Sequence, residues 1–262
     1  MKTQMKKLAL LLLAGCVAAP AHAGTVVQDV LDCMHANLPP AIRVQNIELT
    51  TTDRGGATRS LKGRLYAMRE EGLIRANLKI DAPESYAGAS YLVRQASDYL
   101  HDGMYVYLPS VRRVKRITGT FADGALLGTD FSYNDFRQLF GMFDRAGLQM
   151  EDDAKVEDRP VHVMALTPNI KSGSPYNKVR AWVDTQTCVP LKIELYKSNA
   201  VQKRLTVPGA DLLLDGHYWT AGEVRMDNVV TGTSSVLKVS RAEGKAKLPA
   251  HIFAPALFYE SR

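Results

Sequence analysis

The residues of this sequence best suited to chemistry form a short cluster of cations. Arg112, Arg113, Lys115 and Arg116 make up the densest positive cluster beyond the amino-terminal segment. Guanidinium and ammonium groups bind phosphates and carboxylates, so the cluster could be a cationic rim that meets lipid headgroups. The alternative is a solvated strand face, where charges need no further role. A nucleic-acid site fits poorly because no aromatic stacking motif interleaves these residues, and we expect no nucleic-acid partner.

A second candidate site is an aromatic segment. Four of the seven phenylalanines lie between residues 131 and 143. The pair Ser132 and Asp135 predicts a helix start, and the helical period places residues 136, 139, 140 and 143 on one face of a helix over 132–143. That face could pack in an ordinary core, or it could be a lid over an apolar ligand cavity. The candidate lid and cavity residues are Phe131, Tyr133, Phe136, Leu139, Phe140 and Phe143.

Signals of enzymatic chemistry are missing from the sequence. It has no Gly-x-Ser-x-Gly elbow, no His-Glu-x-x-His, no Cys-x-x-Cys and no phosphate-binding glycine loop. The histidines beyond residue 23 are scattered singly. The acidic run Asp152, Asp153, Glu157 and Asp158 lacks the spacing of a calcium loop and is interpreted as an exposed connection. We therefore predict a protein that is not an enzyme, with no catalytic residue, no metal and no cofactor.

The amino terminus predicts export. Lys2, Lys6 and Lys7 precede an apolar run from Leu8 to Val17, which is too short to span a membrane and is typical of a secretory signal. No second long apolar stretch follows. Removing residues 1–23 would take away three lysines and no acid, and the formal charge would fall from +6 to +3. A strongly basic character is thus a property of the precursor, and the case for a polyanionic partner is weak.

Two processing sites compete at the end of this signal. The triplet Ala21-His22-Ala23 favours cleavage before Gly24, with residues 1–23 as signal peptide and 24–262 as a single domain. The sequence Leu13-Ala14-Gly15-Cys16 instead looks like a lipoprotein box, in which Cys16 would carry a lipid anchor. We favour the first site because Thr25 begins structure at once and no polar tether follows Cys16.

The two remaining cysteines are expected to pair. Cys33 lies on the apolar face of the first predicted helix, and Cys188 directly precedes a predicted core strand. Export permits a disulfide, so we predict a Cys33–Cys188 bond that holds the helix against the sheet, with two buried thiols as the alternative.

These candidate sites must be positioned by a strand-rich chain. Helices are predicted at 25–37, at the aromatic segment and near 249–257, and alternating apolar and polar residues predict about ten or eleven strands. No βαβ rhythm occurs, so the fold class is mainly β, with one large curved antiparallel sheet or unclosed β-barrel covered by short helices. The predicted strands lie near residues 43–52, 61–67, 74–81, 88–95, 98–108, 157–166, 179–183, 189–195, 201–207, 217–230 and 234–241. Because so few helices are available to fill the concave face, the pattern favours a real cavity with the aromatic helix as its cover.

Two motifs resemble a known family. The stretch YLPSVRRVKRI at residues 107–117 and the stretch GTDFSYND at 128–135 look like the signature of LolA-like outer-membrane lipoprotein-sorting proteins, in a poorly characterised bacterial branch. The likeness extends loosely over most of the chain after residue 23, including Cys188-Val189-Pro190-Leu191 before a core strand.

The resemblance implies an unclosed barrel whose hydrophobic cavity receives acyl chains, in a monomeric periplasmic carrier of lipid or lipoprotein. Phe131, Tyr133 and Phe136 would then be lid or cavity residues, and Arg112, Arg113 and Arg116 the cationic strip. An inner-membrane transporter and an outer-membrane acceptor are the implied partners. No residue is identified as the cavity arginine of the sorting carriers, so another lipid or hydrophobic compound stays open as cargo. The alternative functions are an envelope-stress or lipid sensor and an accessory protein of an inner-membrane exporter.

Overall fold

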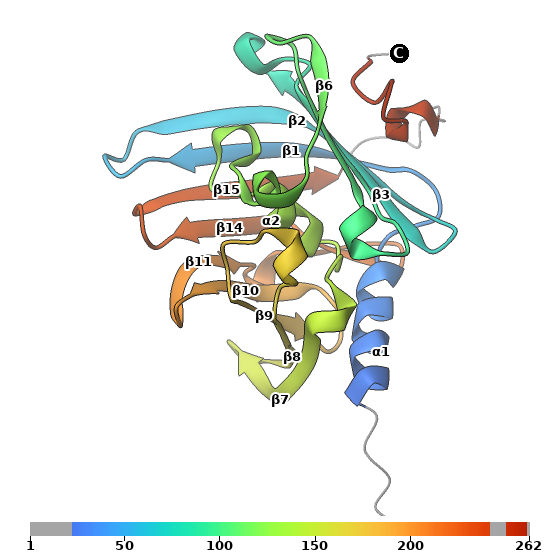
Figure 1. Ribbon diagram of the computed structural model, residues 1–262, viewed down its shortest axis with the longest axis vertical. Coiled ribbons are helices and arrows are strands. Elements are labelled where there is room, and N and C mark those ends of the chain that lie inside the picture. The colour runs from blue at the N-terminus through green and yellow to red at the C-terminus, as the bar shows by residue number, and fades with distance from the viewer. Residues whose placement is uncertain (1–22, 242–249, 261–262) are drawn as a thin grey trace, which may run out of the picture.

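The computed structural model describes residues 23–241 and 250–260, and its main feature is one 13-stranded antiparallel sheet (Figure 1). The strands of this sheet are β1 (Arg43–Thr52), β2 (Thr58–Glu70), β3 (Leu73–Ala82), β4 (Ser90–Arg94), β5 (Gly103–Leu108), β6 (Arg113–Arg116), β7 (Leu148–Val156), β8 (Arg159–Leu166), β9 (Lys178–Asp184), β10 (Pro190–Lys197), β11 (Ala200–Thr206), β14 (Glu223–Asn228) and β15 (Thr233–Arg241). A separate hairpin consists of β12 (Leu212–Asp215) and β13 (Tyr218–Ala221).

Two α-helices and several short 3-10 turns connect and cover these strands. The helices are α1 (Ala23–Ala36) and α2 (Tyr133–Gln138). The 3-10 turns are η1 (Glu84–Tyr86), η2 (Tyr99–His101), η3 (Gly119–Asp123), η4 (Leu126–Gly128), η5 (Arg145–Gly147), η6 (Ile170–Ser172), η7 (Gly209–Asp211) and η8 (Ala250–Phe253). The predicted first helix is confirmed by α1, whereas the predicted carboxy-terminal helix is only the short turn η8.

The sheet consists of two meanders that meet at its middle. Its strand order is β6-β5-β4-β3-β2-β1-β15-β14-β11-β10-β9-β8-β7, so β1 pairs with β15 and every other neighbour is close in sequence. β6 and β7 lie at opposite edges (Figure 1). The predicted large antiparallel sheet is confirmed, and it is not closed into a barrel.

The core lies on the concave face, where α1, α2 and the segment between β6 and β7 pack against the strands. Val27, Val30, Leu31 and Met34 give α1 a buried stripe in this core. Cys33, on the same helix, is joined to Cys188 with a Cα–Cα distance of 5.7 Å, which confirms the predicted disulfide. The helix is thereby fixed to the start of β10 in the second meander.

The opposite face of β2 to β5 is also covered, by the carboxy-terminal segment 250–260. Phe253 and Phe258 of that segment form a second buried cluster with residues of the sheet. Asn77 Nδ2 donates to the carbonyl oxygen of Phe258 at 2.8 Å, and Lys79 Nζ donates to that of Glu260 at 2.7 Å. Two polar residues of β3, Asn77 and Lys79, are therefore buried under the end of the chain, whereas Asp81 stays exposed.

Three predictions about local structure were wrong. The predicted helix over 132–143 ends at Gln138, because Gly141 adopts a left-handed φ of +75° that turns the chain toward α1. Strands β7 and β12 were missed, since their side chains do not alternate clearly between buried and exposed, whereas β6 is the exposed strand that was the alternative for the cationic run. In consequence, Asp152 and Asp153 lie on β7, and only Glu157 and Asp158 of the acidic run form an exposed connection.

Candidate functional site

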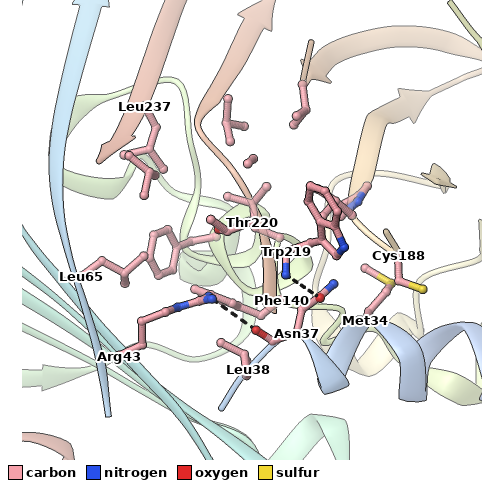
Figure 2. Close-up of a pocket in the computed structure, with 18 residues that line it drawn as sticks. Met34, Asn37, Leu38, Arg43, Leu65, Phe140, Cys188, Trp219, Thr220 and Leu237 are labelled. Carbon is pink, nitrogen blue, oxygen red and sulfur yellow. Dashed lines mark hydrogen bonds between the residues drawn. The ribbon is translucent and has the colours of Figure 1, made fainter. Parts of the chain in front are cut away.

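A cavity of about 70 Å³ lies between α1, α2, the β12–β13 hairpin and the concave face of the sheet (Figure 2). Its walls are mostly apolar and come from parts of the chain that are far apart in sequence. α1 contributes Met34, the chain just after it contributes Leu38, the sheet contributes Leu65 and Leu237, and the hairpin contributes Trp219. Ligand pockets usually measure about 300–1,000 Å³, so the cavity as it stands is smaller than a typical ligand pocket.

Asn37 connects three of these walls. Its Oδ1 accepts a hydrogen bond from the backbone N–H of Trp219, and its Nδ2 donates to the carbonyl oxygen of Thr187 at 2.8 Å. Its own carbonyl oxygen accepts from a guanidinium nitrogen of Arg43 at 3.3 Å (Figure 2). One residue just beyond the end of α1 thus contacts the hairpin and the loop before β10 through its side chain, and the start of β1 through its carbonyl oxygen.

Arg43 places a cation in this apolar lining. Burial lowers the pKa of its guanidinium, while Asp215 and Tyr218 oppose that shift. The Nε atom of Arg43 is buried and has no hydrogen-bond partner among the described residues. A buried donor without a partner is unfavourable, so the site is chemically ready for an acceptor oxygen from a ligand.

The aromatic segment supplies the other side of the cavity through α2. Ser132 and Asp135 form the predicted capping box, which starts the helix. The rings of Phe136 and Phe140 meet edge to face with centroids 5.4 Å apart, and Tyr91 of β4 contacts Phe136 at 5.7 Å. These contacts tie the apolar side of the helix to the sheet.

The polar side of α2 is fixed by a buried network. Arg137 forms an ion pair with Asp102, and both side chains are almost fully buried. Arg137 also donates to Asn134 Oδ1 at 2.9 Å, and Asn134 donates to Asp123 of η3 at 3.1 Å. Breaking a buried ion pair typically costs about 3–5 kcal/mol. Moving the helix out of its place would therefore break this buried pair.

The structure divides the six predicted lid and cavity residues into two groups. Phe136, Leu139 and Phe140 line the cavity. Phe131 and Phe143 are buried in the main core, and Tyr133 packs against that core half-buried. The middle of the segment is thus a cavity wall, and both of its ends are ordinary core.

The cationic cluster lies elsewhere. Arg113, Lys115 and Arg116 belong to the edge strand β6, and Arg112 lies in the turn before it. All four side chains are exposed, and none is among the described residues that line the cavity. Strand pairing places Lys115 opposite Val106 and Arg116 opposite Tyr105, so the cluster is split between the two faces of the sheet.

The cavity residues that sequence analysis missed include Asn37, Arg43 and Trp219. The turn pair Asp215-Gly216 was visible, but residues 217–230 were expected to form one strand rather than β13 followed by β14. Splitting that stretch at Gly222 would have revealed the hairpin. Nothing in the local sequence marks Arg43 as buried.

His35 closes the contact between α1 and the turn after α2. Its Nε2 lies 3.1 Å from the carbonyl oxygen of Gly141. A Cβ atom on Gly141 would come within 3.0 Å of Met34, so the close approach requires glycine. Burial lowers the pKa of His35, although the Gly141 carbonyl opposes the shift.

A family model described as an uncharacterised protein matches residues 75–258. The chain belongs to that family.

Three solved structures share the fold of this chain. A domain described as an outer-membrane lipoprotein-sorting protein, from Vibrio parahaemolyticus, has 23% identity and a TM-score of 0.75 over 89% of this chain and 100% of its own. A DUF1329 family protein from Desulfovibrio piger has 20% identity and a TM-score of 0.75, and the match covers 89% of this chain and 98% of its own.

The third is a LolA superfamily protein from Nitrosomonas europaea, with 18% identity and a TM-score of 0.61 over 87% of this chain and 97% of its own. The predicted resemblance to LolA-like proteins is thus confirmed at the level of fold. No curated protein matches the sequence.

Among the helices of residues 23–241 and 250–260, none has the length and apolar character needed to cross a membrane. The predicted signal peptide and the alternative lipid anchor at Cys16 lie outside the described residues.

Proposed function

We propose that this member of the family carries a lipid or a lipidated protein through the periplasm, with an acyl chain held in the cavity between α1, α2 and the β12–β13 hairpin. The carrier performs no chemistry on its cargo. The observation that carries the proposal is an apolar cavity with one buried, unpaired Arg43 donor in its wall. The name of the lipoprotein-sorting relative supports the same class of cargo.

The small cavity volume implies that cargo entry displaces part of the wall. Burying one methylene contributes about 0.8 kcal/mol, so a 16-carbon chain offers on the order of 10 kcal/mol. Releasing the hairpin breaks the hydrogen bond from Trp219 to Asn37 and exposes a few half-buried side chains, at a cost of a few kcal/mol. Moving α2 would also break the buried pair of Arg137 and Asp102. We therefore assign the gate to the β12–β13 hairpin and the fixed wall to α2.

Arg43 would bind the polar end of the chain. Its Nε–H can donate a hydrogen bond to an ester, amide or carboxylate oxygen. That bond would remove the desolvation penalty of a buried donor without an acceptor. The acyl tail would then run along Leu65, Leu237 and Phe140. Such a site accepts any lipid with an oxygen at the head of an apolar chain, including the linkage of a lipoprotein anchor.

The test is to purify the protein from periplasm without detergent, then use native mass spectrometry and organic extraction. Ala221 lines the cavity, and Ala221→Trp should fill it. Ala200 is exposed at the start of β11, and Ala200→Trp is the matched control. We expect acylated species on the unaltered protein and on the control, and none on the Ala221→Trp variant. Protein that is empty in all three forms and takes up no added palmitate would refute the proposal.

A further inference from the structure

Three exposed apolar side chains stand beside four exposed cations at one end of the molecule. Val111, Val114 and Phe121 have 57%, 37% and 61% of their surface exposed. We call these residues together with Arg112, Arg113, Lys115 and Arg116 the hairpin patch, because all but Phe121 belong to the β5–β6 hairpin. Scattered exposed hydrophobes need no explanation, but a group of them mixed with cations does.

The members of the patch lie close together in space as well as in sequence. Lys115 Nζ sits 4.4 Å from the centre of the Phe121 ring, which joins the hairpin to η3. Val111, Val114, Arg113 and Lys115 line a surface groove of about 410 Å³, with Val106 and Leu108 at its base. Figure 1 shows β6 at the edge of the sheet opposite β7.

Edge protection alone does not explain this composition. Charges on an edge strand prevent another chain from pairing with it, and β6 is such a strand. Protection would be served by cations with polar neighbours. Instead, Val114 lies within the edge strand, and Phe121 is more than half exposed beside it.

The charge of the patch indicates its partner. Within the described residues, none of the four cations forms an ion pair with a carboxylate. Cations flanking exposed aromatic and aliphatic side chains are the composition of a surface that lies in the interface of an anionic bilayer. The cations meet lipid phosphates, while Phe121, Val111 and Val114 enter the level of the first acyl carbons.

We propose that the hairpin patch docks the protein onto an anionic lipid bilayer. The split of the cations over both faces of β6 suits this role, since an edge strand that points at a membrane presents both of its faces to the headgroups. The proposal concerns a surface separate from the cavity and holds whatever the cavity contains. Because η3 is hydrogen-bonded to α2 through Asp123 and Asn134, the docked surface is also joined directly to the cavity wall.

Vesicle flotation tests the electrostatic part. The protein is mixed with vesicles of one part phosphatidylglycerol to three parts phosphatidylethanolamine, or with phosphatidylcholine vesicles, at low and high salt. Each cation near an anionic surface raises affinity about fivefold, so replacing all four by serine should weaken binding on the order of 100-fold or more. The matched control replaces four exposed cations elsewhere by serine, namely Arg54, Lys62, Lys155 and Lys197.

We expect the unaltered protein and the control to float with phosphatidylglycerol vesicles at low salt, and neither to float with phosphatidylcholine. An equal loss of vesicle binding in both four-serine variants would mean that binding depends only on net charge, and it would overturn the proposal. Absence of vesicle binding by the unaltered protein would also overturn it, and would leave an acidic protein as the occupant of the patch.

Insertion of the apolar residues has its own readout. In Phe121→Trp the new indole should shift its emission to shorter wavelength when phosphatidylglycerol vesicles are added. The matched variant is Val230→Trp, at a position 68% exposed in the turn between β14 and β15, and its emission should not change. The native Trp182 and Trp219 contribute equally to both spectra. No shift for Phe121→Trp, with binding intact, would contradict insertion.

Discussion

The backbone N–H of Trp219 donates a hydrogen bond of 2.9 Å to Oδ1 of Asn37, and this bond joins the β12–β13 hairpin to the end of α1. The hairpin is not part of the main sheet, so this bond is one of the contacts that hold it over the cavity, together with the packing of Leu212 and Ala221 against the core.

Asn37→Ala should loosen the hairpin. Leaving the Trp219 amide without its acceptor costs about 1–3 kcal/mol, so amide hydrogen exchange over residues 212–221 should speed up roughly tenfold. Exchange in β1 to β4 should stay the same. Asn37→Asp is the control, since it keeps the acceptor for Trp219 and loses only the donor to Thr187. If the hairpin amides exchanged at the same rate in Asn37→Ala as in the unaltered protein, the assignment of the gate to the β12–β13 hairpin would be contradicted.

Arg43→Met should lower the affinity for a lipid with a polar headgroup without lowering the affinity for a plain hydrocarbon. The variant keeps most of the side-chain volume but removes the buried donor, and hydrogen bonds to charged groups contribute about 1.5–3 kcal/mol. Palmitate affinity, measured by calorimetry, should fall at least tenfold, while affinity for a hydrocarbon of equal length should hold or rise. The exposed Arg54→Met serves as control. A parallel loss for both ligands would mean that Arg43 shapes the cavity and binds no headgroup.

His35 should make the protein less stable in mild acid. Its side chain is 5% exposed, and burial holds its pKa below the usual value of about 6.5. The unfolded chain therefore binds a proton more readily than the folded chain. This contribution to stability is complete above about pH 6.5 and falls as the pH drops toward the lower folded pKa. Urea midpoints between pH 7.5 and 5 should decline less for His35→Gln, and parallel declines would exclude His35 as the cause.

Loss of the disulfide should weaken the attachment of α1. Replacing Cys33 and Cys188 by serine should lower the free energy of unfolding by about 2–5 kcal/mol, because the bond closes a long loop in the unfolded chain. Guanidinium titration of this variant should match that of reduced unaltered protein. Cys188 also lines the cavity, so palmitate binding should weaken in parallel. Unchanged stability after verified reduction would show that packing alone holds the helix.

Much of the fold follows from local patterns in the sequence. The apolar stripe of α1, the capping box of Ser132 and Asp135, and the alternation in β1, β3, β9 and β10 all predict their elements within a few residues. The pairing of Cys33 with Cys188 was predicted on the expectation that the chain is exported and that Cys16 is removed with the signal, which leaves two cysteines. The existence of a cavity was predictable because the sheet is large and helices are few.

What could not be predicted depends on contacts between distant segments. Asn77 and Lys79 look like solvent-facing strand residues, and only residues 250–260 make them buried. Arg43 starts a strand with no local sign of burial, and the hairpin that covers it comes more than 160 residues later. The same limit applies to Phe131 and Phe143, whose types suggested a lid and whose neighbours make them core.

The pairing of β1 with β15, which joins the two meanders, affects the rate at which the chain folds. Within each meander, strands pair with near neighbours and can form hairpins quickly. Thr52 must find Ser234 across most of the chain before the two meanders become one sheet. We therefore expect two fast local steps and one slow closure in folding, and until β15 pairs with it, β1 would be an open edge that other unfolded chains can join.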